Sequence, residues 1–386
     1  MIDPQWQQAR KILVVRLDNL GDVLLATPAM HALKVALPEA QITLLASPVG
    51  AQAGYLNRDI DDVIEYEAPW VDPWQRTSHD PAREQAMIEQ LRRAEFDAAI
   101  IFTSFRQSPL PAAYLSYLAG IPLRLAASVD APGSLLTTRH RHPERAMHEV
   151  ERGLDLVGAI GIPSEQSDLV IDVPADARRH AQMRRRELLR ISDGERHGPF
   201  VMVHPGCSMP ARTYPAEQYS EVIDALVTDL NATVVLTGVD TERDLVAGIR
   251  RGVHPSGQPH VHDLAASLSF PDLCALVGTA DLLVTNNTGP MHIAAAMDTP
   301  VIALFALTNP PEQWRPWKVP HRLLNNDVPC RICYQRICPF EQECIRSVSA
   351  TDVLAAARDL GVGCTSQGEP VKWVAASPAM SESVLS

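Results

Sequence analysis

A polar loop between two apolar runs carries the residue types best suited to bind an anion. Residues 285–292 have the sequence TNNTGPMH and lie between the apolar runs 282–284 and 293–296. This order predicts a buried strand, a tight loop and the first turn of a helix. The free N–H groups and the dipole of a helix N-terminus favour negative charge, and a hydroxyl, a glycine and a histidine stand beside them here. The alternative is a helix that Thr288 caps and that binds nothing, which the loop alone favours.

A carboxylate near the start of the chain could act as a general base. Residues 16–22 have the sequence RLDNLGD and follow a short apolar run. Gly21 allows a tight turn, but the segment lacks the G-x-G-x-x-G pattern of dinucleotide-binding loops. Asp22 either caps the next helix, which composition alone favours, or accepts a proton at the end of the first strand.

Two further loops offer groups that recognise a nucleotide. Residues 204–212 have the sequence HPGCSMPAR, in which Arg212 could clamp a diphosphate through paired hydrogen bonds. The alternative is an ordinary polar loop with an exposed arginine. Glu242 follows the segment LTGVDT and either complements the dipole of the next helix or accepts hydrogen bonds from ribose hydroxyls.

Each of these loops follows a predicted strand, so the strands must bring the loops together. Alternating strands and helices predict βαβ units and mainly parallel sheets, which bind ligands outside the carboxyl ends of their strands. We expect strands at residues 11–15, 41–46, 63–66, 96–102, 199–204, 233–236, 280–285 and 301–305, with helices at 22–37, 81–94, 216–230, 241–251, 270–278, 291–297 and 350–360.

The length of 386 residues predicts two domains. We place the first at residues 1–190 and the second at residues 198–364, with a linker near 191–198 and a disordered tail at 365–386. The basic run that begins near residue 178 is interpreted as the solvated face of a helix. The last helix, near 350–361, is a candidate to pack back on the first domain.

Charge and hydropathy exclude some classes of protein. The formal net charge of −12 argues against a general nucleic-acid-binding protein, which needs a basic surface. The start of the chain lacks the pattern of a signal peptide, and no apolar run approaches the length of a transmembrane helix. We therefore expect a cytoplasmic protein, with any membrane contact peripheral and at the inner face of the inner membrane.

The order of the four loops resembles glycosyltransferase family 9, the bacterial lipopolysaccharide heptosyltransferases, from about residue 11 to residue 360. The resemblance implies the α/β fold called GT-B, in which two Rossmann-like, doubly wound domains face each other across a cleft. It implies an inverting transferase that moves a sugar, first of all heptose from ADP-heptose, onto a saccharide acceptor of the lipopolysaccharide core or a related glycan. Its partners are a nucleotide-sugar donor and a saccharide or glycolipid acceptor, and its chemistry requires no cofactor.

Three alternatives stay open: a different nucleotide sugar, an acceptor outside lipopolysaccharide, and a nucleotide-sugar-binding protein without catalysis.

The resemblance also implies residue roles. Asp22 falls on the proposed catalytic base of the family, and Asn287 stands where the family commonly has aspartate. The donor-binding positions are Ser208 and Arg212 in the first half of the diphosphate site, Glu242 at the nucleoside, Leu268 at the adenine edge through its backbone, and Asn287, Thr288, Gly289 and His292 in the diphosphate loop.

An acceptor attached to negatively charged lipid A requires basic residues in the first domain. An acidic segment at residues 59–67 precedes the candidates and leaves the acceptor open. The candidates are Arg106, Arg124, Arg139, His140 and Arg141.

The cysteines fall into two groups. Cys207, Cys274 and Cys364 are scattered, and an odd total of seven argues against a disulfide framework. The others form a C-x2-C-x4-C-x5-C cluster, whose spacing does not match a standard two-knuckle zinc site. Both a loop of reduced thiols and a small structural metal site, zinc or iron–sulfur, stay open for Cys330, Cys333, Cys338 and Cys344.

Overall fold

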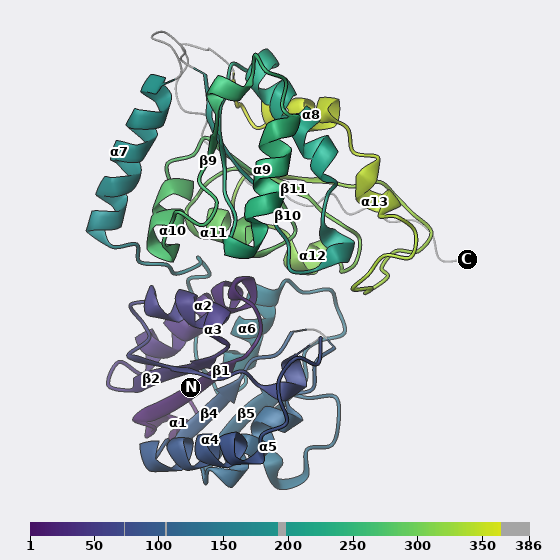
Figure 1. Ribbon diagram of the computed structural model, residues 1–386. Coiled ribbons are helices and arrows are strands. Elements are labelled where there is room, and N and C mark those ends of the chain that lie inside the picture. Colours follow the sequence, from purple (N-terminus) through teal and green to yellow (C-terminus); the bar gives the residue numbers. More distant parts are fainter. Residues whose placement is uncertain (73, 105, 192–197, 364–386) are drawn as a thin grey trace.

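The protein folds into two α/β domains, each built on a six-stranded parallel sheet (Figure 1). The structure is a computed structural model that describes residues 1–72, 74–104, 106–191 and 198–363. The predicted two-domain GT-B architecture is confirmed. The tail 365–386 and most of the predicted linker lie outside the described residues.

The first sheet has the strand order β3-β2-β1-β4-β5-β6, so the chain changes direction between β1 and β4. Its central strands are buried on both faces, which explains their continuous apolar sequences. Ile12 and Val14 pack on the side of α2, α3 and α6, whereas Leu13 and Val15 pack on the side of α4 and α5 (Figure 1). The elements are α1 (Pro4–Gln7), β1 (Lys11–Arg16), α2 (Leu20–Ala36), β2 (Gln41–Ala46), α3 (Pro48–Tyr55), β3 (Asp62–Glu65), α4 (Pro81–Ala94), β4 (Ala98–Ile101), α5 (Leu110–Leu118), β5 (Leu123–Ala127), β6 (Thr138–His140) and α6 (Glu149–Gly158).

The second sheet repeats this design with the order β12-β11-β10-β7-β8-β9, and its change of direction lies between β7 and β10. Both switch points lie at the strands that precede the candidate loops, where doubly wound sheets bind their ligands. The elements are α7 (Ala175–Ile191), β7 (Phe200–His204), α8 (Ala216–Asp229), β8 (Thr233–Leu236), α9 (Arg243–Gly252), β9 (Val261–Asp263), α10 (Phe270–Val277), β10 (Leu282–Asn286), α11 (Gly289–Ala296), β11 (Val301–Leu304), α12 (Pro311–Trp314), β12 (His321–Leu324), α13 (Glu343–Arg346) and α14 (Ala350–Asp359).

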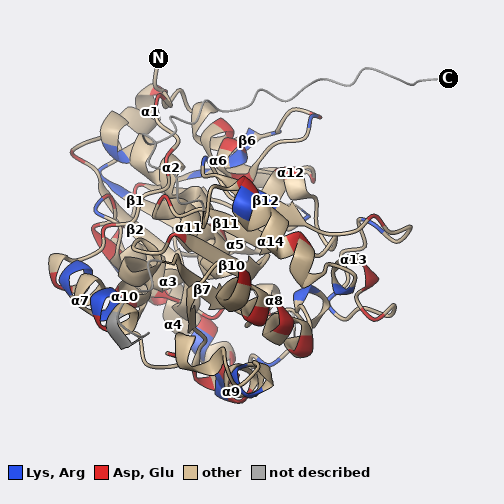
Figure 2. Cartoon of the chain, turned by 90° about the horizontal axis from the view of Figure 1, so that it is seen from above, with Lys and Arg blue, Asp and Glu red and all other residues tan. Residues whose placement is uncertain are grey.

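Helix α7 packs against α10 of the second domain, although the sequence placed it in the first (Figure 1). Ala177, Ala181 and Leu188 form its buried face, because they recur at helical spacing. Basic residues lie along α7, and Arg178, Arg179 and the other exposed ones agree with a solvated face (Figure 2). The domain boundary therefore moves from residue 190 to the segment between α6 and α7.

Helix α14 packs on α8, β11 and β12, so the expectation that it returns to the first domain is corrected. Val353 and Ala357 are fully buried in the core of the second domain. A C-terminal amphipathic helix can cover either domain, and here the second sheet supplies the apolar surface.

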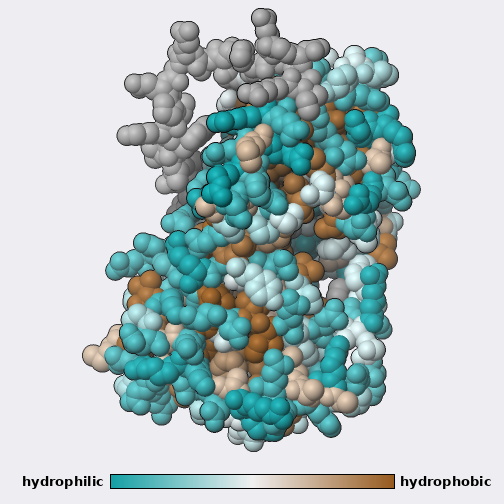
Figure 3. All heavy atoms as spheres, turned by 60° about the vertical axis from the view of Figure 1, so that its left-hand side comes forward, coloured by the Kyte–Doolittle hydropathy of each residue, from teal (hydrophilic) through white to brown (hydrophobic). Residues whose placement is uncertain are grey.

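The two domains touch through α2 and α11. Leu24 of α2 and Met291 of α11 belong to one buried cluster that spans both domains. Figure 3 shows a narrower waist between the two halves, where the surface is hollowed. No helix in the described parts of the chain is long and apolar enough to cross a bilayer.

Candidate active site

Three predicted site residues from both domains converge where the two sheets face each other. Asp22 lies in the first turn of α2, directly after β1, while Arg212 and His292 follow β7 and β10 of the second domain. Burial lowers the pKa of His292 to about 4, and the charge of Asp22 opposes that shift. Burial also lowers the pKa of Arg212, again against the charge of Asp22. A carboxylate of the first domain thus faces an arginine and a neutral histidine of the second.

The carboxylate of Asp22 is held by side chains rather than by its own helix. Its Oδ1 atom accepts a hydrogen bond from the Ser104 hydroxyl at 3.1 Å and one from Arg16 Nη2 at 3.3 Å. The N-cap position of α2 belongs to Asn19, so the capping alternative for Asp22 is not what the structure shows. One oxygen of Asp22 is therefore fixed, which orients the carboxylate as a general base requires.

Arg16 is the centre of a buried charge cluster. Its Nε atom lies 3.0 Å from Asp18, and its Nη2 atom lies 3.5 Å from Glu149 as well as near Asp22. The side chains of Arg16, Asp18 and Glu149 are 4 %, 7 % and 3 % exposed, so water screens these pairs little. Burial raises the pKa of Asp18 and of Glu149, and Arg16 opposes both shifts.

Sequence reasoning missed two members of this cluster. Ser104 and Glu149 lie 88 and 133 positions from Arg16, and neither stands in a motif. The only available signal was Arg16 itself, a charged residue at the end of an apolar strand.

The N-terminus of α11 has the form predicted for an anion site. Thr288 occupies the N-cap position but its hydroxyl makes no capping bond, and Pro290 lies in the first turn. The loop is fixed by the buried amide of Asn286, which donates to the Pro205 carbonyl at 2.8 Å and accepts from the Tyr214 N–H at 3.0 Å. The amide of Asn286 therefore ties the loop after β7 to the loop after β10, and the Thr288 side chain adds a hydrogen bond to Cys207.

Asn287 belongs to a chain of neutral groups that positions Arg212. Its Nδ2 atom donates to Asn309 Oδ1 at 2.9 Å, and the Thr308 hydroxyl donates to the same oxygen at 3.2 Å. Arg212 Nε in turn donates to the Thr308 hydroxyl at 2.8 Å. Within the described residues, the buried Asn287 Oδ1 and His292 Nδ1 atoms lack a hydrogen-bond partner. Both atoms are therefore available to a ligand group at this site.

Glu242 lies against the glycine turn after β7. Its Oε2 atom accepts from the Val239 N–H at 2.9 Å and lies 3.7 Å from His204 Nε2. A Cβ atom on Gly206 would lie 2.0 Å from Oε1 of Glu242, so a larger residue there would displace this carboxylate. Burial raises the pKa of Glu242.

The two remaining donor-site predictions lie on neighbouring loops. Ser208 is exposed on the loop after β7, and Leu268 is half-buried on the loop after β9. The latter loop is tied to the end of β8, because the Ala266 N–H donates to the Gly238 carbonyl at 2.8 Å. Both residues thus lie at the same edge of the sheet as Glu242.

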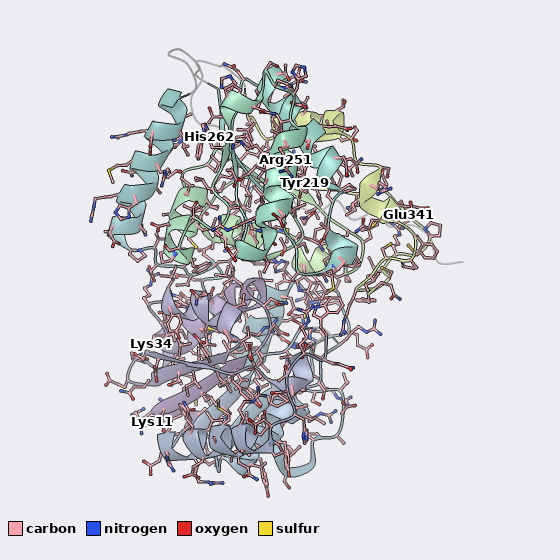
Figure 4. All side chains as sticks on the ribbon, viewed as in Figure 1. Lys11, Lys34, Tyr219, Arg251, His262 and Glu341 are labelled. Atoms are coloured by element: carbon pink, nitrogen blue, oxygen red, sulfur yellow. The ribbon has the colours of Figure 1, made fainter. Side chains whose placement is uncertain are left out.

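The cysteine cluster lies on a projecting loop, on which Glu341 is labelled in Figure 4. Four cysteines line one small cavity beside Ala211 and Leu307, and all of them are free thiols. In the described parts of the chain, no three cysteine sulfurs are close enough to share an ion, so a structural metal there is not supported. Cys364 lies outside the described residues. The four cysteines of the loop are Cys330, Cys333, Cys338 and Cys344.

Of the basic residues proposed for the acceptor, Arg106 lines a cavity of the first domain. Arg124 is 8 % exposed and donates to backbone carbonyls, as Arg139 does, so both are structural. Arg141 reaches the carbonyl of Val129.

His140 shares one carboxylate oxygen of Asp155 with His142, and both nitrogen–oxygen distances are 2.6 Å. The ligand atoms of His140, His142 and Asp155 all lie within 4.8 Å of one another, which is close enough to hold a metal ion.

Comparisons with known proteins identify the family and the fold. Residues 85–343 match the sequence profile of glycosyltransferase family 9 (heptosyltransferase). Lipopolysaccharide heptosyltransferase 3 of Escherichia coli (strain K12) is 29% identical over 317 residues, which are 77% of this chain and 82% of the relative.

Two solved structures share the fold. The ADP-heptose lps heptosyltransferase II of E. coli has a TM-score of 0.69 at 20% identity and covers 91% of this chain and 98% of its own. A family 9 glycosyl transferase from Veillonella parvula has a TM-score of 0.72 at 20% identity and covers 93% and 97%.

Proposed function

The chain belongs to glycosyltransferase family 9, and on that premise we propose that it transfers a heptose from ADP-heptose to a saccharide acceptor with inversion at the anomeric carbon. The acceptor in this proposal is a sugar of the lipopolysaccharide core or of a related glycan, free or attached to lipid. The E. coli enzyme with the same fold is named an ADP-heptose lps heptosyltransferase, and this name supports the choice of donor and acceptor.

The observation that carries the proposal is the position of Asp22 opposite Arg212 and His292. A carboxylate whose charge acts on both residues lies across the cleft from them. Transfer of a sugar from a diphosphate needs a base on the acceptor side and a positive or hydrogen-bonding group on the leaving-group side. The two domains supply one requirement each.

In the proposed mechanism, Asp22 removes a proton from the acceptor hydroxyl. The oxygen then attacks the anomeric carbon from the face opposite the diphosphate, so the bond to the diphosphate breaks as the new bond forms. Ser104 and Arg16 hold one oxygen of Asp22, which leaves the other to take the proton. The reaction uses no cofactor.

The departing nucleotide carries the negative charge that develops. Arg212 and the N-terminus of α11 at Thr288 and Gly289 are placed to stabilise it. Because burial lowers the pKa of His292 to about 4, this residue is neutral at pH 7 and contributes a hydrogen bond rather than a charge. Glu242 in this proposal accepts hydrogen bonds from the ribose, beside the loop of Leu268 and the exposed Ser208.

The Asp22→Asn variant tests this proposal. We expect the release of ADP from ADP-heptose to fall by at least about 100-fold, because general-base catalysis contributes about 10²–10⁴-fold. The affinity for ADP should stay within twofold, since Asp22 lies on the acceptor side. Asp62→Asn is the matched control, because Asp62 is an exposed carboxylate of the same domain. Full activity of Asp22→Asn would rule out the proposed base.

A thermal-shift series with ADP-, UDP-, GDP- and dTDP-linked sugars tests the donor. A ligand that binds only the folded state raises the melting temperature, so the largest shift is expected for ADP-heptose. A larger shift with another nucleotide sugar would identify that sugar, instead of ADP-heptose, as the donor. Binding without turnover for every acceptor offered would favour a nucleotide-sugar-binding protein.

A further inference from the structure

A cavity of about 250 Å³ opens in the first domain at the carboxyl ends of β1 and β4. Its wall on one side is the 3-10 helix Pro69–Val71, and on another the start of α5. Its volume is below the ~300–1,000 Å³ of pockets for drug-sized ligands, which suits a single sugar ring. The apolar part of the lining consists of Val15, Leu17, Trp70, Val71, Ile101, Phe102, Pro111 and Ala112.

The polar part of this cavity includes a carboxylate and an amide in contact, those of Asp18 and Gln107, beside Thr103, Arg106 and Ser108. Gln107 Nε2 donates to Asp18 Oδ1 at 2.5 Å, while Asp18 Oδ2 lies 3.0 Å from Arg16 Nε. Each carboxylate oxygen can accept a second hydrogen bond, and the amide of Gln107 retains a second N–H. An accepting group and a donating group therefore lie side by side. Such a pair can bind two neighbouring hydroxyls of a sugar, because each hydroxyl both donates and accepts hydrogen bonds.

This polar end of the cavity adjoins the proposed base. Gln107 Oε1 accepts from the Ser104 N–H at 3.1 Å, and the Ser104 hydroxyl donates to Asp22 at 3.1 Å. Ser104 therefore links Gln107 to Asp22. A sugar ring held by Asp18 and Gln107 would lie next to the carboxylate that is proposed to deprotonate it.

The charges around the cavity select against an acidic ring. Asp18 is 7 % exposed and presents negative charge to the inner end. The only cationic side chain among the described lining residues is Arg106, which is exposed. Its guanidinium lies 4.4 Å from the ring centroid of Tyr334, a residue of the cysteine loop. Arg106 is therefore engaged with Tyr334 at the rim, and the buried charge of Asp18 disfavours an anionic ring at the inner end.

We propose that this cavity binds the acceptor as one neutral sugar ring, with Asp18 and Gln107 as its specificity-determining residues and Trp70 as an apolar wall. The inference rests on the proposed transferase function and adds the chemical class of the acceptor. Aromatic side chains provide flat apolar surfaces that suit the C–H face of a sugar ring, while the polar pair fixes its rotation.

Saturation-transfer NMR with two small glycosides, in the presence of ADP, tests the class of ligand. We expect the neutral methyl α-heptopyranoside to bind and the anionic methyl α-glucuronide not to bind. Asp18→Asn should weaken binding of the heptoside about tenfold or more, because hydrogen bonds to charged groups are the stronger ones. Asp62→Asn is again the matched control and should bind like the wild type. Equal or tighter binding of the glucuronide would overturn the proposal.

A second variant keeps the test valid if Asp18→Asn disturbs folding. Gln107 is exposed, so Gln107→Ala should keep the wild-type melting temperature. We expect it to raise the KM for the acceptor about three- to tenfold with an unchanged KM for the donor. An unchanged acceptor KM would refute the role of the pair.

Failure of this inference is distinguishable from failure of the proposed function. If ADP-heptose is consumed in an Asp22-dependent reaction while Gln107→Ala and Trp70→Ala leave the acceptor KM unchanged, only the acceptor site is wrong. If no nucleotide sugar is consumed at all, the proposed function itself fails.

Discussion

The two sides of the cleft handle charge in opposite ways. In the first domain, three carboxylates surround Arg16 within 3.5 Å. In the second domain, Arg212 is held by the hydroxyl of Thr308, and no described carboxylate forms an ion pair with it. The first side is a compensated anionic cluster, whereas the second has a positive charge held only by neutral groups.

This difference fits the two halves of a sugar transfer. A base needs negative charge that is stabilised but still available, and Arg16 provides the stabilisation from behind Asp22. A diphosphate needs positive charge that no carboxylate has neutralised, which a scaffold of amides and hydroxyls preserves. The asymmetry therefore supports, on electrostatic grounds, the proposal that the acceptor and the donor bind to separate domains.

Replacement of the two arginines tests the contrast most directly. We expect Arg16→Met to lower the free energy of unfolding by about 3–5 kcal/mol, because it leaves buried carboxylates without their partner. Arg212→Met should change it by less than about 1 kcal/mol, since no buried ion pair is broken. Urea denaturation of both variants measures the difference.

Nucleotide binding should show the reverse order. Arg212→Met should weaken ADP binding at least tenfold, while any folded fraction of Arg16→Met should bind ADP normally. Equal losses of stability in the two variants would contradict the proposed asymmetry.

The buried histidine of the donor side predicts a loss of stability in acid. The pKa of His292 is about 4 in the folded protein and 6.5 when unfolded. A depressed pKa contributes stability that is complete above pH 6.5 and is lost as the pH falls toward 4. From pH 8 to pH 5 this one group should cost about 2 kcal/mol of unfolding free energy.

His292→Gln isolates this effect, because His148 and His204 titrate in the same direction in both proteins. Glu149 in the first domain acts in the opposite sense, since burial raises its pKa and its contribution declines as the pH rises. Chemical denaturation at pH 8 and pH 5 should show a smaller drop for His292→Gln than for the wild type. The same drop in both would show that His292 is not buried as a neutral group.

Two glycines at the contact between the domains form a matched pair. A Cβ atom on Gly21 would lie 2.6 Å from His292 Cδ2, whereas one on Gly289 would lie 3.5 Å from Leu20. Gly21→Ala should lower kcat about 10–100-fold, because a shift of about 1 Å at a reacting group costs up to about 100-fold. At saturating donor, Gly289→Ala should keep a kcat within about threefold of the wild type, since 3.5 Å is an ordinary contact; saturation is required because Gly289 belongs to the proposed diphosphate site. Comparable rates for both variants would show that the domains adjust freely at this contact.

The sequence predicted the elements that local patterns encode. The strands near residues 11–15 and 41–46 match β1 and β2, because buried parallel strands are continuous apolar runs. Short elements such as β6 and β9 were missed, because three residues hold no periodicity. The domains on which α7 and α14 were expected to pack were wrong, because the sequence of an amphipathic helix does not specify which domain covers its apolar face.

The candidate loops were found because each follows a strand. The hydrogen bonds and ion pairs that hold their side chains were not predicted. The residues that hold Asp22 and Arg212 come from distant parts of the chain, such as Ser104 and Asn309. Asn287 was predicted to bind the donor, and the sequence did not reveal that it also belongs to the hydrogen-bond chain that supports Arg212. Such side-chain contacts depend on tertiary packing and leave no local pattern.

The smallest expected effect concerns the contact that joins the two sides at the rim of the first-domain cavity. Tyr334 lies on the cysteine loop of the second domain and stacks on Arg106 of the first. Its N–H donates to the Thr308 carbonyl at 2.9 Å, so the stacked ring is fixed to the residue that also holds Arg212. The acceptor rim therefore depends on the position of the donor domain.

Tyr334→Ala removes this contact without touching either polar centre. An exposed cation–π pair is worth about 0.5–1 kcal/mol, so we expect the acceptor KM to rise about two- to fivefold. The donor KM should not change, because the Thr308–Arg212 bond remains. Tyr114→Ala, an exposed tyrosine of α5, is the matched control. A rise in the donor KM instead would mean that the cysteine loop contributes to nucleotide binding. The proposed division of the cleft into an anionic acceptor side and a cationic donor side would then be wrong at this loop.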